Sequence, residues 1–259
     1  MVKIHLVTSL PAAEAAVKKL LCVPEAAIAV RCQGVKIDAK KGTLTSVTCC
    51  TADGEVYVFD VKKCEDVLLL GGLIRVFQST ELVKVVHDCS TDNLLLKKYG
   101  VKVRNYFDTA VAYSVILEQR GLPPRKISLQ NICDKFGIER FRPERSEQIK
   151  LREDVNYFGL RPMSRLMLNI CASYVLPLIP SLYHVLAQQL ETTSWEWFDY
   201  MSEENRLSKV QPERISSERE KRKTERYLKN LHLYPITRMS KEEKHLLQDS
   251  VPDSQEFVF

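Results

Sequence analysis

The sequence lacks several features that define whole classes of protein. It has no run of about 18 apolar residues, so we expect no membrane-spanning segment and no membrane partner. The apolar stretch at residues 4–10 is too short, and its flanks are wrong, for a signal peptide. None of the eight cysteines forms a CxxC pair, and most lie in apolar runs. This pattern predicts reduced, buried cysteines and argues against a zinc site or a disulfide framework.

Length and charge leave two domain organisations open. The chain has 259 residues, enough for one sizeable domain with an extension or for two small domains. Its hydrophobic content of 45% is ordinary for a globular protein, so most of the chain should fold. The net charge of +5 is compatible with nucleic-acid binding but does not establish it.

Strand-like segments come early in the chain. Runs of small and β-branched residues predict strands at residues 3–8, 27–34 and 83–87. Residues 42–61 predict a hairpin with its turn at Asp53-Gly54. Helical patterns follow over residues 11–21, 68–77, 88–100, 108–121 and 128–137. Pro177 and Pro180 should break the last long apolar helix, residues 161–190. The order predicts an α/β fold, a mixed β-sheet with helices on both faces.

The character of the chain changes near residue 195. Segment 208–230 has eight Lys or Arg against four Glu, and few apolar residues. Residues 246–259 are typical of a weakly ordered tail. We therefore predict one domain at residues 1–195 and a charged, helical C-terminal extension at residues 196–259.

Five stretches resemble the DEDD family of 3′–5′ exonucleases, in the family's order. VRCQG at 30–34 is similar to the first motif, hDxEg, and VHDCSTD at 86–92 to the second, hHNxxxD. The third motif and its helix resemble residues 156–186, and FDTAVAYSVI and SLQNICDKFGI lie between the second and third motifs. The resemblance covers roughly residues 1–190 and implies an RNase H-like mixed β-sheet flanked by helices.

The family's catalytic positions are mostly not acidic in this chain. Family members use four carboxylates to hold two divalent metals, and a tyrosine or histidine positions the attacking water. By the resemblance, the first-motif carboxylates fall on Arg31 and Gln33, and the second-motif aspartate falls on Asp92. The third-motif tyrosine falls on Ile170 and its aspartate on Tyr174. Of the four carboxylates, only Asp92 is kept.

Charge decides what these replacements mean. A guanidinium about 4 Å from a divalent ion is repelled by roughly 8 kcal/mol at an effective dielectric of 20. One carboxylate with one amide is also a poor ligand set for Mg²⁺ or Mn²⁺. We therefore expect no metal, no cofactor and no nuclease activity. Arg31 should fill the place of a metal and pair with Asp92, in a site that is structural and inactive.

Other side chains near these motifs have competing explanations. His87 and Asp88 could form a hydrolytic dyad, but no serine or cysteine is clearly paired with them, so we expect His87 to pack at a strand end. Trp195 and Trp197 could stack bases, cover an edge of the core, or join Phe198 in a dimer contact.

A basic stripe is the candidate RNA-binding surface. On a helix, four cations of the extension fall on one face, at i, i+3, i+4 and i+7: Arg219, Arg222, Lys223 and Arg226. Such a stripe could contact phosphates of single-stranded RNA without reading its sequence. It could equally be a solvated face with pairs such as Glu218 with Arg222. The sequence leaves both explanations open.

Degenerate members of the same family suggest a function. The chain is similar to inactive exonuclease-domain proteins of the germline piRNA pathway. This resemblance implies an RNA-binding adaptor that joins PIWI and Tudor-domain proteins, forms a homodimer, and lies in the cytoplasm and its perinuclear germ granules. The alternatives are a dimerisation and interaction scaffold without RNA binding, and an active exonuclease with a rearranged site. The Sm-like part of such proteins is not visible here, which suggests a fragment or a relative that lacks it.

Overall fold

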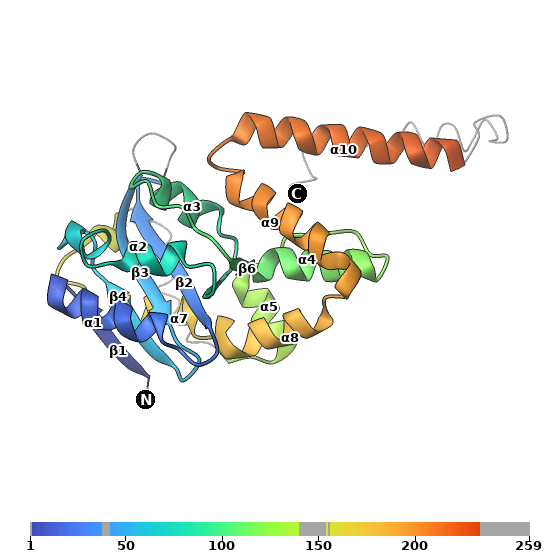
Figure 1. Cartoon of the computed structure of the whole chain (residues 1–259). Helices are drawn as coiled ribbons and strands as arrows, with labels where there is room; N and C mark the ends of the chain where they lie inside the picture. The colour runs from blue at the N-terminus through green and yellow to red at the C-terminus, as the bar shows by residue number, and fades with distance from the viewer. Residues whose placement is uncertain (1, 38–41, 140–153, 155, 234–259) are drawn as a thin grey trace. The chain divides into compact units, whose positions relative to one another are not determined.

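The structure of the protein is a computed structural model, drawn in Figure 1. It describes residues 2–37, 42–139, 154 and 156–233, with side chains up to residue 225. The chain divides into two compact units, Met1–Val210 and Gln211–Phe259. The first unit therefore includes residues 196–210, which the sequence assigned to the extension.

A six-stranded mixed sheet forms the centre of the first unit, in the order β1-β4-β3-β2-β5-β6. β2, β5 and β6 are parallel, β3 is antiparallel to both β2 and β4, and β1 is parallel to β4. The predicted early strands and hairpin are confirmed. The strands are β1 (Lys3–Val7), β2 (Ala27–Val35), β3 (Thr43–Cys50), β4 (Glu55–Phe59), β5 (Val83–Val86) and β6 (Tyr106–Asp108).

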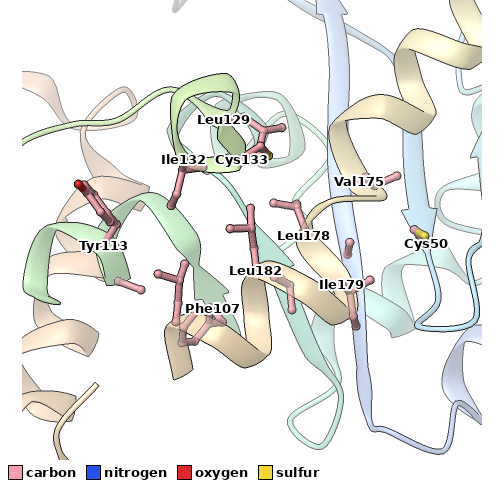
Figure 2. Packing of buried hydrophobic residues seen from close by; sticks show 14 of the residues in the cluster. Cys50, Phe107, Tyr113, Leu129, Ile132, Cys133, Val175, Leu178, Ile179 and Leu182 are labelled. Atoms are coloured by element: carbon pink, nitrogen blue, oxygen red, sulfur yellow. The ribbon is translucent and has the colours of Figure 1, made fainter. Parts of the chain in front are cut away.

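Helices cover both faces of this sheet, as predicted. Alternate residues of β2 enter different core clusters, Ala27 and Ala29 on one face and Ile28 and Val30 on the other. The Ile28 face is covered by α1 (Leu10–Leu21), α2 (Leu73–Gln78) and α3 (Ser90–Lys97). The Ala27 face packs against α4 (Thr109–Gln119), α5 (Leu129–Phe136), α7 (Arg165–Val175) and α8 (Tyr183–Gln189), a core shown in Figure 2.

The long apolar stretch breaks where its prolines predicted. The chain between α7 and α8 breaks at Ile179, whose φ of −133° and ψ of 136° are extended rather than helical. Residues Arg165–Gln189 are long and apolar enough to cross a membrane by length and composition, and no other helix in the described part of the chain is. We expected no membrane-spanning segment, and by length and composition this one helix departs from that expectation. In the fold, its residues Val175, Leu178 and Ile179 pack in the core of Figure 2.

Segment 68–77 departs from its predicted single helix. Its helix, α2, begins only at Leu73, after a 3-10 turn at Glu65–Val67. Gly72 has a φ of +81°, which side-chain-bearing residues rarely adopt. A Cβ on Gly71 would lie 2.7 Å from the Cβ of Ala13, so only glycine lets this turn approach α1 so closely. Two glycines thus replace the first half of the predicted helix with a tight turn.

The last helices fall in different units. α9 (Trp195–Leu207) belongs to the first unit, where Phe198 is 1% exposed and its ring centroid lies 4.9 Å from that of Phe107. Phe198 is therefore a core residue and not available for the predicted dimer contact. α10 (Pro212–Leu233) belongs to the second unit and confirms the predicted helical, charged extension.

Candidate functional site

β2 carries the two first-motif positions. Arg31 and Gln33 are alternate residues of this strand, so their side chains project from the same face. The register of β2 against β3 shifts between Gln33 and Gly34. A Cβ on Gly34 would lie 2.8 Å from a methyl of Leu95, so glycine lets α3 approach the strand directly.

Arg31 forms an ion pair with Asp92 in the first turn of α3. The Arg31 Nη1 lies 3.1 Å from Asp92 Oδ2, and the other carboxylate oxygen accepts the backbone N–H of Cys32. The same Nη1 lies 3.1 Å from the carbonyl oxygen of His87. The predicted pairing of Arg31 with Asp92 is confirmed, and it ties β2 to the start of α3.

Burial makes this pair interdependent. The side chains of Arg31 and Asp92 are 27% and 6% exposed. Burial raises the pKa of the Asp92 carboxyl, while Arg31 and the Cys32 N–H act in the opposite direction. For Arg31, burial acts to lower the pKa, but the surrounding groups, led by Asp92, together raise it, so the guanidinium stays charged. Removing either partner would leave the other as a buried, unpaired charge, which is costly.

The third-motif positions lie on α7 and bring no carboxylate. The Arg31 guanidinium carbon lies 5.7 Å from the centroid of the Tyr174 ring, within range of a cation–π contact. Ile170 is 2% exposed and buried. The structure thus gathers Arg31, Asp92 and Tyr174, and surrounds the guanidinium with a carboxylate and an aromatic ring.

Gln33 is buried among hydroxyl groups of β3. Its Oε1 accepts the Ser46 hydroxyl at 3.2 Å and the Thr48 hydroxyl at 3.3 Å. Its Nε2 is buried and has no hydrogen-bond partner among the described residues. A neutral amide can be held by these two hydroxyls without the neighbouring cation that a carboxylate would need.

Divalent metals do not fit the residues at this centre. Arg31 places a positive charge there, and the Asp92 carboxylate is already shared between this guanidinium and a backbone N–H. In the described ranges, no group of three or more His, Cys, Asp or Glu side chains is arranged to hold a metal. The described residues at this centre thus differ from the set of carboxylates that a two-metal site needs.

A buried aspartate that the sequence did not single out organises the neighbouring loop. Asp108, at the end of β6, is 0% exposed and accepts the backbone N–H groups of Asp88 and Cys89, each at 3.0 Å. It also caps α4 and accepts the Asn205 amide of α9 at 3.0 Å. The pattern FDT ahead of a helix could have indicated the cap, but nothing in the sequence indicates a contact with Asn205.

The mouth of this centre is close to neutral. Lys126 lies 3.9 Å from Asp88 and Arg31 pairs with Asp92, while the buried carboxylate of Asp108 is held by backbone N–H groups. His87 uses both ring nitrogens inside the fold, toward the Thr109 hydroxyl and the Ile127 carbonyl. The expectation that His87 packs at the strand end is confirmed.

The predicted basic stripe lies on α10. Arg219, Arg222 and Lys223 are described there, with Lys223 exposed and the two arginines partly so, whereas the side chain of Arg226 lies outside the described residues. Lys223 Nζ lies 3.0 Å from Glu220, so part of the stripe's charge is compensated within the helix. The structure includes both features that the sequence left open, a cationic face and ion pairs along it.

A family model described as 3'-5' exonuclease matches residues 4–191. Among curated proteins, piRNA biogenesis protein EXD1 of Danio rerio is 30% identical over 127 residues, covering 46% of this chain and 34% of that protein. The EXD1 protein of Homo sapiens is 28% identical over 149 residues, covering 53% and 29%. The chain therefore spans about a third of the length of these relatives, or less.

Solved structures share the fold. The catalytic core of RRP6 from Trypanosoma brucei superposes with a TM-score of 0.61 at 21% identity, covering 82% of this chain and 53% of that one. Escherichia coli RNase D gives 0.61 at 17% identity, covering 80% and 51%. A complex of Trypanosoma brucei RNase D with RNA gives 0.56 at 18% identity, covering 73% and 69%. The topology of exonuclease domains is thus present around the Arg31–Asp92 pair.

Proposed function

The chain belongs to the 3′–5′ exonuclease family, and from this premise we propose that it is a catalytically inactive member that binds RNA. The observation that carries the proposal is the ion pair between Arg31 and Asp92, with Nη1 and Oδ2 3.1 Å apart. It occupies the centre where the family's carboxylates would grip two metals. A guanidinium there repels a divalent cation and consumes the one carboxylate that remains.

Loss of catalysis need not remove RNA binding. Contacts to phosphates require cations and no metal. The neutral mouth around Asp88 and Lys126 gives little net attraction for phosphate. The α10 stripe is the better candidate, because Arg219, Arg222 and Lys223 lie within five consecutive positions of an exposed helix. Single-stranded RNA bound there would be held weakly and without sequence preference.

The curated relatives suggest a biological setting. Their names assign them to piRNA biogenesis, and we extend that pathway to this chain. Within the proposal, it acts as an adaptor between PIWI and Tudor-domain proteins, as a homodimer, in the cytoplasm and its perinuclear germ granules. The adaptor role fits a fold that keeps the family's shape and lacks the means to hold its metals.

One observation favours a second candidate, a scaffold without RNA binding. On α10, Arg214 lies 3.6 Å from Glu218 and Lys223 lies 3.0 Å from Glu220, so some cations are already paired. If these pairs persist, the stripe offers phosphates little. An active exonuclease with a rearranged site has no comparable support, since it needs clustered carboxylates.

A gel shift with labelled single-stranded RNA, with and without Mn²⁺, separates the three candidates. The proposal expects a shifted band and an RNA of unchanged length in both lanes. No shift at low salt would favour the scaffold. Mn²⁺-dependent shortening that is lost in Asp92→Asn would establish an active exonuclease and overturn the proposal.

A further inference from the structure

We propose that a groove between α1 and the turn before α2 docks an acidic, leucine-rich segment of another protein. The groove has a volume of about 660 Å³. Its walls come from one face of α1 and from the turn that precedes α2, and both elements lie on the same side of the sheet in Figure 1. The inference does not rest on RNA binding or on the exonuclease centre.

Three exposed leucines line this groove. Leu21 is 37% exposed, Leu69 is 45% exposed and Leu70 is 68% exposed. None of them joins the core cluster on this face, although Leu68 beside them is 0% exposed. Single exposed leucines are ordinary, whereas these three lie together along one concavity and contribute to its apolar lining.

The fold holds these leucines in place. The turn is fixed by backbone hydrogen bonds from Gly71 to Asp66 at 2.8 Å and from Gly72 to Leu69 at 3.1 Å. Gly71 is the position where a Cβ would clash with α1, so the turn lies directly against the helix. Leu69 and Leu70 are thus presented on a preorganised turn, and a partner would lose little free energy in ordering them.

Charge indicates the chemistry of the partner. Two cations, Lys18 and Arg75, and one carboxylate, Glu14, line the groove. Among the described residues, no ion pair or hydrogen bond occupies the side chain of Lys18 or Arg75, whereas the neighbouring Lys19 lies 3.8 Å from Glu55. A segment with leucine-type side chains and flanking carboxylates would cover the leucines and pair with both cations. Complementary charge of this kind mainly sets specificity and association rate.

The test is a selection with a defined probe. A phage library of random peptides of about 15 residues, long enough for a marginal helix, is panned against the full chain. Enriched peptides should combine two or more leucine-type residues with net negative charge. Their affinity should fall at least about tenfold, or 1.4 kcal/mol, for Leu69→Asp with Leu70→Asp, and also for Lys18→Glu with Arg75→Glu.

A matched control carries the same change at other exposed leucines. Leu122 and Leu160 are 51% and 53% exposed and lie outside the groove, so Leu122→Asp with Leu160→Asp should keep full affinity. Thermal unfolding checks that each variant folds. No enrichment, enrichment of basic peptides, or equal binding to the Leu69/Leu70 variant would overturn the proposal. So would sedimentation that shows a dimer dissociated by that variant, because a second copy would then fill the groove.

Discussion

Two arginine–carboxylate pairs in this chain have the same chemistry in opposite surroundings. Arg31 and Asp92 lie 3.1 Å apart with side chains 27% and 6% exposed, whereas Arg214 and Glu218 on α10 lie 3.6 Å apart with 53% and 43% exposed. The buried pair cannot separate without stranding a charge in the protein, so it fixes β2 against α3. The exposed pair can exchange its partner for water or phosphate at little cost. Burial therefore decides which cations are structural and which can bind a ligand.

Breaking the buried pair should have the largest effect. Asp92→Ala leaves Arg31 without its carboxylate and the Cys32 N–H without its acceptor, and should lower the free energy of unfolding by about 3–5 kcal/mol. Glu218→Ala should lower it by less than about 0.5 kcal/mol. Urea titration followed by circular dichroism measures both. Equal losses in the two variants would contradict the contrast drawn from burial.

The contrast extends to a buried lysine, Lys84, which forms no ion pair with a carboxylate in the part of the chain that the structure describes. Lys84 on β5 is 0% exposed, donates to the carbonyls of Ser79 and Leu82 at 2.5 and 2.6 Å, and has its pKa lowered by burial to about 8. Between pH 8 and its unfolded pKa near 10.5, the unfolded chain binds more protons than the folded chain. The free energy of unfolding should therefore rise with pH across this window.

Lys84→Met removes that titration. Between pH 8 and pH 10.5, the free energy of unfolding should rise by up to about 3 kcal/mol more in the wild-type chain than in the variant. Lys63→Met is the control, since Lys63 is exposed. Urea titrations at several pH values provide the comparison. The same pH dependence in the wild type and Lys84→Met would show that this lysine does not titrate as proposed.

The proposed RNA surface should respond to charge on α10 and not to charge elsewhere. Changing Arg222, Lys223 and Arg226 to Glu should weaken binding of single-stranded RNA by at least about tenfold. It should also reduce the salt dependence, by about 2 log units of affinity per log unit of salt if three phosphate contacts are lost.

The control for this charge reversal makes an equal change in net charge on the first unit. Lys63, Lys97 and Arg104 are exposed there, and their change to Glu should leave RNA affinity nearly intact. Fluorescence anisotropy across a salt series measures both variants. An equal loss of RNA affinity in the control would show that net charge, and not the stripe on α10, determines binding. Loss in Arg31→Ala alone would move the binding surface to the exonuclease centre.

The sequence predicted what depends on local pattern and on known motifs. The alternation of β2, the hairpin turn at Asp53-Gly54 and the order of the exonuclease motifs were sufficient for the fold. The resemblance placed Arg31 and Asp92 at motif positions that share one site in the family, and the structure brings the two side chains together. The family match over residues 4–191 confirms the exonuclease-family assignment.

Contacts between distant segments were beyond prediction from the sequence. Asp108 accepts Asn205 across 97 positions, and neither residue belongs to a pattern that names the other. The aromatic run at residues 195–198 gives no sign of which ring faces inward, and the structure buries Phe198 against Phe107. The glycine pair after Leu70 forms a tight turn where the apolar run predicted the first half of a helix.

The smallest effect is expected for a partial repair of the first motif, which should yield almost no nuclease activity. Arg31→Asp with Gln33→Glu restores the first-motif acids beside Asp92. The third motif stays unrepaired, because Ile170 stands in place of its tyrosine and Tyr174 in place of its aspartate. Catalytic groups that act as one unit contribute non-additively, so partial repair should yield almost nothing. Adding Ile170→Tyr and Tyr174→Asp is the matched comparison, assayed with labelled RNA and Mn²⁺ once folding is verified. Robust cleavage by the double variant alone would mean that another residue supplies the missing carboxylate and that the third-motif assignment is wrong.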